Sequence, residues 1–386
     1  MNMENYFSNL NLDIRIHKLG TFTDQKVTPD VLCAVAECIS EYVEKIGEIF
    51  SINDIRYSDY AEYIATAVFK KPSIENAGSE YNKFFSQPIK MLSYCGVLSE
   101  EKFSRYYRYG VQNNKILQYI ANRERNALNF IQAFSEKLLK DSGIYPKFAD
   151  FFAQPNKNTF ESMKTAFTYL VIQNTPKNTE VEVRRIFTKI INPLAYKHNT
   201  FGTRKGSISN TPITLDELYY NRLNWRDKGK EKSLTRKEAQ ALFADSANAA
   251  NLNYLVNKAK KFVKTLHKTS EVQRFDPTEA NQAHHIFMAS EFPDLASLPE
   301  NLICLTPNQH FNLAHPSNKT AVIDKHYQRI CLMAKLDSIE QDNRANTGNY
   351  DYHEFIHVLN TGFNTDQFDV SMSYETLKHR ILMFDF

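Results

Sequence analysis

The segment that most constrains this chain is histidine-rich and spans residues 279–318, which read EANQAHHIFMASEFPDLASLPENLICLTPNQHFNLAHPSN. Residues 281–288 read NQAHHIFM and can form a strand that ends on two histidines, and residues 301–305 read NLICL, a short apolar strand. Thr306 and Pro307 form a good N-cap and first-turn pair, so a helix is expected over residues 307–315. The order strand, loop, strand, helix places the end of the first strand beside the first turn of that helix.

Four of the chain's 11 histidines lie in this segment, namely His284, His285, His310 and His315. Neutral imidazole accepts a proton near physiological pH and is a common metal ligand. The cluster therefore indicates acid–base chemistry or metal binding. Surface or satisfied core histidines are the alternative interpretation.

The segment resembles the HNH, or ββα-metal, nuclease family. In that family a histidine ends the first strand, often after a second histidine or an aspartate. An asparagine opens the second strand, and a histidine follows nine residues later on the helix. His284, His285, Asn301 and His310 satisfy this pattern, because His310 lies nine residues after Asn301. The resemblance covers residues 279–318 and leaves the rest of the chain unassigned.

The resemblance implies a role for each of these residues. His285 would be the general base that deprotonates the water attacking a scissile phosphate, and Asn301 would tie the loop between the strands by hydrogen bonds to its backbone. His284 and His310 would hold one divalent cation that stabilises developing negative charge. Mg²⁺ is the expected ion, with Mn²⁺, Ca²⁺ or Zn²⁺ as alternatives.

Two departures from the family pattern matter. Many members hold a structural zinc with paired cysteines, but Thr306 and Gln309 occupy the comparable positions here, so no structural zinc is expected. Colicin-type members add a metal histidine four residues after the helical one, where this chain has Ala314. His315 lies one residue further, about 100° around an α-helix. We therefore expect His315 to contact DNA phosphate or to be structural.

A rival motif occurs nearer the end of the sequence. His353, Glu354 and His357 form an H-E-x-x-H pattern, in which two histidines share one helix face and could bind zinc, with the glutamate as base of a metalloprotease. Only three positions are fixed, and no spacing singles out His379 as a third ligand. A small amphipathic helix is the simpler interpretation.

The charge distribution suggests a polyanionic partner. Formal net charge is only +3, yet residues 184–238 hold 13 basic and five acidic side chains, and a second basic run follows at 258–268. Such segments can neutralise phosphates, although a solvated helix face is the alternative. The candidate DNA-binding residues in the polar stretch 196–238 are Arg204, Lys205, Arg226 and Lys228.

The N-terminal region reads as helical. Apolar spacing predicts helices over residues 30–50, 58–69 and 79–96, then a strand or wing with the sequence FSRYYRYGV, and one long helix over 113–140. Helix, loop, helix and ribbon is the order of a winged-helix DNA reader, with Ser86, Gln87 and Lys90 on the recognition helix. An ordinary helical bundle explains the same spacing.

Together these patterns predict an α+β chain, with a mostly helical N-terminal region followed by a small ββα-metal module. We expect a helical, winged-helix-like region over 1–155, a helical and basic region over 156–270, the nuclease module over 271–345 and a helical extension over 346–386. No apolar run approaches the roughly 18 residues of a membrane span, and the five scattered cysteines argue against a disulfide scaffold, so a cytoplasmic protein is expected.

The family resemblance and the long N-terminal region imply a type II restriction endonuclease that cuts double-stranded DNA at specific sequences. No G-x-x-x-x-G-K-[ST] motif occurs, so no nucleotide cofactor is expected. Cutting both strands with one site per chain favours a homodimer. A homing or phage HNH nuclease and a DNA-binding protein without catalysis are the alternatives.

Overall fold

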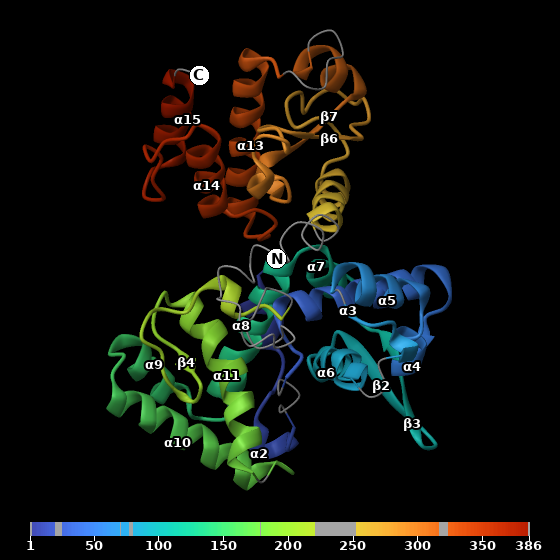
Figure 1. Cartoon of the computed structure of the whole chain (residues 1–386), viewed down its shortest axis with the longest axis vertical. Coiled ribbons are helices and arrows are strands. Elements are labelled where there is room, and N and C mark those ends of the chain that lie inside the picture. The colour runs from blue at the N-terminus through green and yellow to red at the C-terminus, as the bar shows by residue number, and fades with distance from the viewer. Residues whose placement is uncertain are drawn as a thin grey trace, which may run out of the picture. The chain divides into compact units, whose positions relative to one another are not determined.

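The computed structural model describes residues 2–19, 25–69, 71–76, 80–177, 179–220, 252–315 and 323–384. It divides the chain into two compact units, an N-terminal unit of Met3–Ala244 and a C-terminal unit of Asp245–Phe386 with Met1–Asn2 (Figure 1). Both helices and sheets are present, so the chain is of mixed α and β structure. The division differs from the four regions expected, because the helices of 156–197 pack with the N-terminal unit whereas the helix over 252–266 belongs to the C-terminal unit.

The N-terminal unit is built mainly of helices. They are α1 (Met3–Ser8), α2 (Ile14–His17), α3 (Pro29–Lys45), α4 (Ile52–Arg56), α5 (Asp59–Tyr63), α6 (Glu80–Tyr94), α7 (Asn114–Asn122), α8 (Glu124–Asp141), α9 (Tyr145–Ala153), α10 (Lys157–Asn174) and α11 (Glu180–Lys197), with short helical turns η2 (Ile64–Val68), η3 (Ile74–Asn76) and η4 (Leu215–Glu217). The apolar helix α3 is central, since it contacts α6, α7 and α8.

The helix predicted over 113–140 is two helices, because the chain is extended at Arg123 between α7 and α8. The buried side-chain amide of Asn126 donates to the carbonyl oxygen of Tyr119 at 2.9 Å. In a continuous helix that carbonyl would accept from the amide of residue 123. A side chain therefore replaces the missing backbone bond, and both short helices pack against α3.

A three-stranded sheet follows the first helices. Strands β2 (Leu98–Phe103) and β3 (Tyr106–Val111) form a hairpin, and β1 (Ile49–Phe50) pairs antiparallel with β3, giving the order β1-β3-β2. The hairpin comes directly after α6, and its tip projects from the unit in Figure 1. A ribbon was expected after the helix of 79–96, and α6 is directly followed by the β2–β3 hairpin. A small hairpin of β4 (Thr203–Arg204) and β5 (Ser207–Ile208) lies further along the chain.

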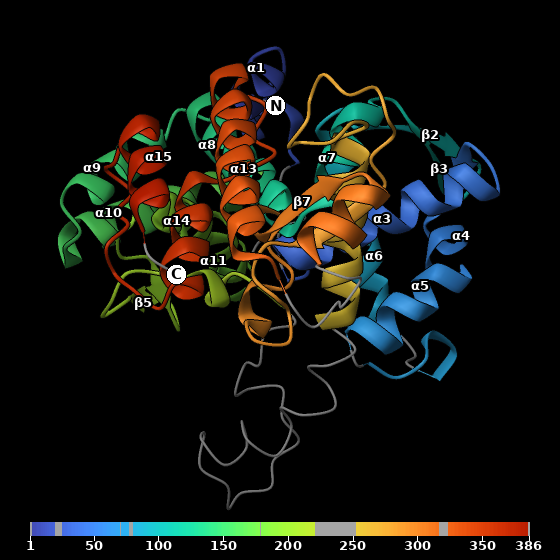
Figure 2. The ribbon, with the colours of Figure 1, turned by 90° about the horizontal axis from the view of Figure 1, so that it is seen from above.

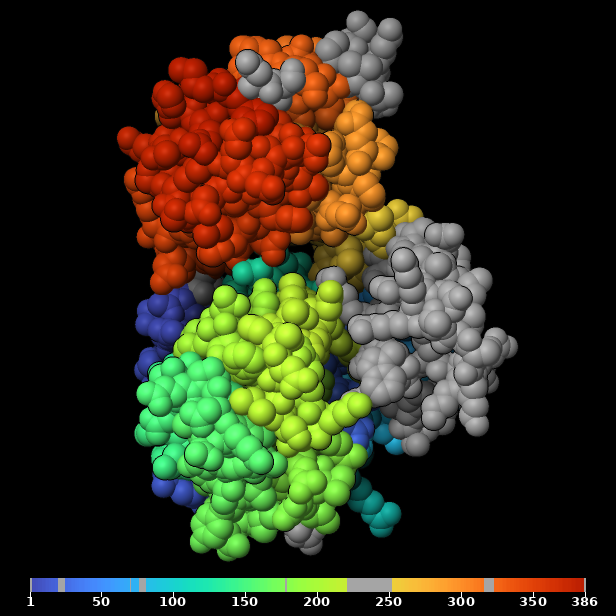
Figure 3. Space-filling model, turned by 60° about the vertical axis from the view of Figure 1, so that its left-hand side comes forward, coloured from blue at the N-terminus to red at the C-terminus, as the bar shows by residue number. Residues whose placement is uncertain are grey.

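The C-terminal unit combines one two-stranded sheet with helices. Its elements are a helix over residues 252–266, β6 (Gln282–His285), η5 (Pro293–Leu295), η6 (Pro299–Asn301), β7 (Leu302–Leu305), the π-helical turn η7 (Gln309–Ala314), α13 (Lys325–Ala345), α14 (Tyr352–Gly362) and α15 (Tyr374–Met383). In Figures 1 and 2, α13, α14 and α15 lie side by side, and the residues of the last two, in red, cover one side of this unit in Figure 3.

One hydrophobic core holds these elements together. It contains Val263 of the helix 252–266, all four residues of β7, Leu332 of α13, Phe355 of α14 and Leu377 of α15, each with at most 1% of its surface exposed. The four-residue strand β7 is buried along its whole length, which fits its continuous apolar sequence. The histidine-rich segment is thus anchored to a core made by parts of the chain on both sides of it.

Candidate metal centre

The two predicted strands of the histidine segment are present and pair with each other. Strands β6 and β7 are antiparallel, with His284 opposite Ile303 and His285 opposite Leu302. His285 is the last residue of β6, as expected, and residues 286–301 connect it to β7. Both histidines therefore lie where the sheet ends and the connection begins.

The helix after β7 begins as predicted at Thr306 and Pro307. Thr306 and Gln309 form a reciprocal cap, because the Thr306 amide donates to Gln309 Oε1 at 3.0 Å and the Gln309 amide donates to Thr306 Oγ1 at 3.3 Å. The Ser270 hydroxyl also donates to Gln309 Oε1, at 2.7 Å. Hydrogen bonds therefore hold the two positions at which many relatives of the proposed family have zinc-binding cysteines.

This helix continues as a π-helical turn, which the sequence did not predict. The His315 amide donates to the His310 carbonyl at 3.2 Å, five residues back rather than four. A turn closed by an i→i+5 bond is wider than an α-helical one, so residue i+5 returns close to residue i. The expectation for His315 assumed an α-helix, whereas the π-helical turn brings its ring to a centroid distance of 5.0 Å from that of His310. With 6% of its surface exposed, His315 is also poorly placed to contact DNA phosphate.

His284, His310 and His315 form one cluster. Their ring centroids are 4.9–5.3 Å apart, and a nitrogen from each ring lies within 4.8 Å of the others. In the part of the chain that the structure describes, no other group of three or more histidine, cysteine or acidic side chains brings its ligand atoms so close together. The cluster joins the end of β6 to the π-helical turn.

The three imidazoles are suited to a metal ion. Burial, aided by the charge of His315, lowers the pKa of His310 to about 4, and burial with His315 and His310 holds the pKa of His284 well below its ordinary value. Both rings are therefore neutral, the form that binds metals. Nδ1 of His310 is buried with no hydrogen-bond partner among the described residues, which an ion would satisfy.

The chemistry of this donor set bears on which ion fits. Three imidazoles and no carboxylate suit zinc, iron, nickel or copper, whereas Mg²⁺ prefers oxygen ligands. The set differs from the expected pair, His284 and His310, by the addition of His315. The residues present therefore fit a transition-metal ion better than the Mg²⁺ we expected from the sequence.

His285 lies next to the cluster and is held by the connection between the strands. Its Nε2 is 2.9 Å from the carbonyl oxygen of Ala296. Because a carbonyl oxygen only accepts, Nε2 carries the hydrogen and Nδ1 keeps the lone pair. Burial lowers the pKa of His285, although the bond to Ala296 opposes this shift. His285 is therefore a neutral, half-buried imidazole with one nitrogen able to accept a proton.

Asn301 makes side-chain-to-backbone hydrogen bonds of the kind we expected. Its Oδ1 accepts from the amide of Phe287 at 2.9 Å, and its Nδ2 donates to the carbonyls of Phe287 at 2.9 Å and Leu295 at 3.2 Å. Asn301 has no exposed surface. It thus fixes the backbone just after His285. It also fixes the middle of the connection, next to the Ala296 carbonyl that is hydrogen-bonded to His285.

Two contributors to this region were missed by the sequence reasoning. Gln328 of α13 donates from Nε2 to the carbonyl of Ile286 at 2.6 Å, and no local pattern indicates this long-range bond. Lys260 lies on the helix 252–266, and its charge lowers the pKa of His284, His285 and His310. The basic run 258–268 was the signal for this lysine, although no single residue stood out in it.

The candidate recognition residues on α6 are not equally available. Gln87 Oε1 accepts from the backbone amides of Gln25 at 3.2 Å and Lys26 at 2.8 Å, so its side chain holds that segment in place. Ser86 is half-buried and Lys90 is exposed. Of the three, Lys90 is the most accessible to a partner.

The candidate phosphate-binding residues of 196–238 also differ in how far their side chains are engaged within the protein. The guanidinium of Arg204 makes two bonds to the carboxylate of Glu217, at 2.5 and 2.7 Å, and a third to Thr211 Oγ1 at 2.8 Å. Arg204 therefore holds its own loop closed. Lys205 is exposed in the tight turn between β4 and β5. Arg226 and Lys228 lie outside the described residues.

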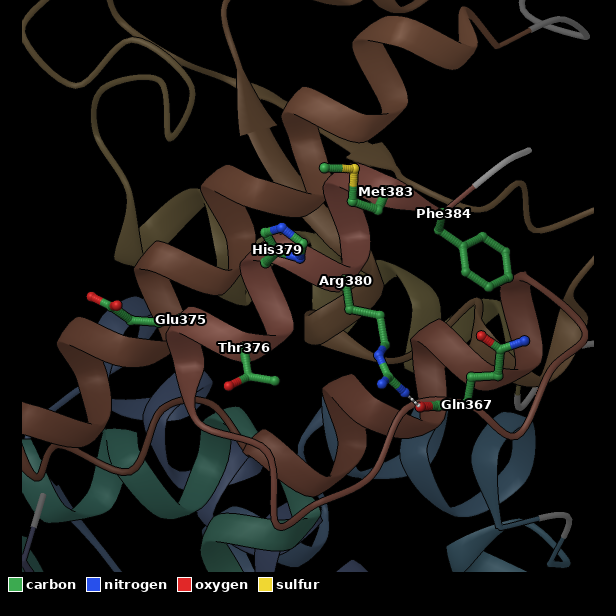
Figure 4. Close-up of a pocket in the computed structure, with 7 residues that line it drawn as sticks. All are labelled: Gln367, Glu375, Thr376, His379, Arg380, Met383 and Phe384. Carbon is green, nitrogen blue, oxygen red and sulfur yellow. Dashed lines mark hydrogen bonds between the residues drawn. The ribbon is translucent and has the colours of Figure 1, made fainter.

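The H-E-x-x-H motif lies on α14, with His353 and His357 exposed. Neither belongs to a three-ligand cluster among the described residues. His379 lies in a surface hollow on α15 instead, where Arg380 reaches the backbone oxygen of Gln367 (Figure 4). The other residues lining this hollow are Glu375, Thr376, Met383 and Phe384.

Comparison of the chain with models of known families, with curated proteins and with solved structures gives no match. Among the described residues, no helix is both long enough and apolar enough to cross a membrane. Any functional assignment therefore depends on the geometry of the histidine segment and on the family pattern in its sequence.

Proposed function

We propose that this chain is a metal-dependent DNA endonuclease of the HNH type. The observation that carries the proposal is the three-histidine cluster beside His285, on a strand–strand–helix element with Asn301 holding the connection. A metal site and an adjacent neutral base are the two parts that a one-metal HNH mechanism of phosphodiester hydrolysis uses. The same element matches the order and spacing of the family pattern.

His284, His310 and His315 would hold the ion, and Zn²⁺, Ni²⁺ or Cu²⁺ suit them better than Mg²⁺. When bound, the ion supplies positive charge that stabilises a phosphate as it gains negative charge. His285 accepts the proton of the attacking water at Nδ1, because Nε2 is committed to the carbonyl of Ala296.

The surroundings of the histidines favour an anionic substrate. From outside the cluster, the charge of Lys260 lowers the pKa of both His285 and His310. Divalent metal and lysine together would make this a strongly positive site. Such a site attracts phosphate.

Sequence specificity, assignment to the type II restriction enzymes and a homodimeric state are further parts of the proposal. The β1-β3-β2 sheet behind α6 supports a DNA-reading role for the N-terminal unit, since helix and ribbon follow each other as in winged-helix readers. A homodimer would match the two-fold symmetry of a palindromic site. No observation on the described residues favours a peptidase.

The test is cleavage of plasmid DNA by the full chain, freed of metal with EDTA and then supplied with Zn²⁺, Mn²⁺, Ni²⁺, Mg²⁺ or Ca²⁺ in turn. We expect cleavage with a transition metal and sequenced product ends that share a short motif. His285→Ala should abolish cleavage and leave DNA binding intact, because a general base acts on the water.

The matched control is His357→Ala, an exposed histidine of α14 in the rival motif. It should cleave like the unmodified chain. Cleavage by His285→Ala at the normal rate, or its loss in His357→Ala alone, would refute the assignment.

A further inference from the structure

The tip of the β2–β3 hairpin has an unusual composition for an exposed turn. Residues 102–108 read KFSRYYR and contain three aromatic side chains, three cationic ones and a serine. All seven are exposed, and Phe103, Tyr106 and Tyr107 keep 48%, 46% and 43% of their surface accessible. Single exposed apolar residues are ordinary, but three aromatic rings within five residues mark an interaction surface.

The rings and charges of this tip are arranged together. Phe103 and Tyr106 face each other across the hairpin with ring centroids 5.5 Å apart. The guanidinium of Arg108 lies over Phe103, 4.2 Å from the ring centroid. Ser104 takes a left-handed backbone conformation, with φ of 56°, so the two strands reverse within a two-residue turn. The result is a narrow ribbon that ends in aromatic and cationic groups.

Charge indicates the class of partner. Lys102, Arg105 and Arg108 carry the charge of the tip, and the acidic residues nearest to them along the strand, Glu100 and Glu101, come before Lys102. A cationic end with exposed rings is complementary to a nucleic acid, whose backbone is anionic and whose bases and sugars offer flat apolar faces. A two-stranded ribbon is also narrow enough to enter a groove of duplex DNA.

We propose that the hairpin tip, residues 102–108, is a DNA-binding surface that grips duplex DNA through its cations and packs its rings against sugars or base edges. The inference rests on the proposed function in taking duplex DNA as the partner. The main DNA contact of the N-terminal unit would then be the hairpin that follows α6, rather than Ser86 and Gln87 of α6. The side chain of Gln87 is already hydrogen-bonded to the backbone of residues 25–26.

The experiment measures binding of the full chain to a fluorescent DNA duplex by anisotropy, in EDTA so that no cleavage occurs, over a series of salt concentrations. Phe103→Ser with Tyr107→Ser should weaken binding by about tenfold or more, the loss expected for one or two aromatic contacts. Arg105→Ala should lower the slope of log affinity against log salt by about 0.9, the value for one phosphate contact.

The matched control is Tyr169→Ser on α10, which removes a ring that is 69% exposed outside the hairpin. It should leave binding unchanged, and circular dichroism should show every variant folded. Affinity within twofold of the unmodified chain for all hairpin variants overturns the proposal. So does a loss confined to single-stranded DNA, which would make the tip a stacking platform for unpaired bases.

This test separates the two proposals. If DNA binding in EDTA depends on the hairpin but no metal supports cleavage, the nuclease proposal is contradicted and the proposal of a DNA-binding hairpin stands. Cleavage at normal rate and specificity by the hairpin variants keeps the nuclease and contradicts the binding surface.

Discussion

Replacing one partner of the buried ion pair between Glu271 and Lys335 should lower the free energy of unfolding by an amount that follows from the structure. Neither side chain has exposed surface, and Lys335 Nζ lies 2.7 and 2.9 Å from the two carboxylate oxygens. Glu271 Oε1 also accepts the amide of Cys304 in β7 at 2.8 Å, and Oε2 accepts the hydroxyl of Ser338 at 2.6 Å. The pair therefore ties α13 to the strand that pairs with β6 and its His284.

Lys335→Met keeps the volume and removes the charge. Burial alone would raise the pKa of Glu271, but Lys335, together with His267 and Ser338, holds it below its ordinary value in the unmodified chain. Without Lys335 the carboxylate keeps its two neutral donors but loses its countercharge. Breaking one partner of such a pair costs about 3–5 kcal/mol. The penalty should shrink as pH falls toward 5, because Glu271 can then take up a proton and become neutral.

Hydrogen exchange of the full chain, followed by mass spectrometry, measures this loss in peptides that cover β7 and α13. Glu271→Gln combined with Lys335→Met is the matched control, since the amide oxygen still accepts from Cys304 and no charge remains buried. The double variant should recover most of the loss, leaving about 1 kcal/mol for a weakened hydrogen bond. A single variant that loses less than 1 kcal/mol, or a double variant no better than the single one, would refute the reasoning.

Two further predictions concern histidines. His315→Ala should weaken Zn²⁺ binding by about 10²–10³-fold, since a four-ligand zinc site is worth about 10–16 kcal/mol and each ligand about 3–4 kcal/mol. Competition with a chromophoric chelator measures the change in affinity. A change of less than threefold would show that only His284 and His310 bind the ion. His267 is neutral in the fold, because burial lowers its pKa to about 4 from an ordinary 6.5. The shifted pKa of His267 therefore adds about 2–3 kcal/mol to the free energy of unfolding above pH 6.5, and this stability is lost as pH falls toward 4. In urea unfolding, the stability of His267→Gln should depend less on pH in the acid range than that of the unmodified chain. An equal dependence would contradict this prediction.

Local hydrogen-bond chemistry made parts of the candidate site predictable. Strand β7 followed from a short apolar run and β6 from a strand expected to end on two histidines. The helix start followed from Thr306 and Pro307, and the capping bonds of Thr306 reach only to Gln309. His285 was expected to end the first strand, and it does; Asn301 was expected to open the second strand but ends the turn η6, one residue before β7. Each of these features depends on residues close together in the chain, so the pattern of the sequence contains its cause.

Tertiary structure decided the rest. His315 belongs to the three-histidine cluster because one backbone hydrogen bond spans five residues instead of four. Sequence periodicity alone predicts the commoner α-helix. Arg204 is engaged by Glu217, 13 residues away, and the break at Arg123 is stabilised by the side chain of Asn126. In the cases of Arg204 and Asn126, a side chain competes with water or with a backbone group for the same partner. The outcome depends on which groups the fold brings together and removes from water, and sequence spacing does not contain that information.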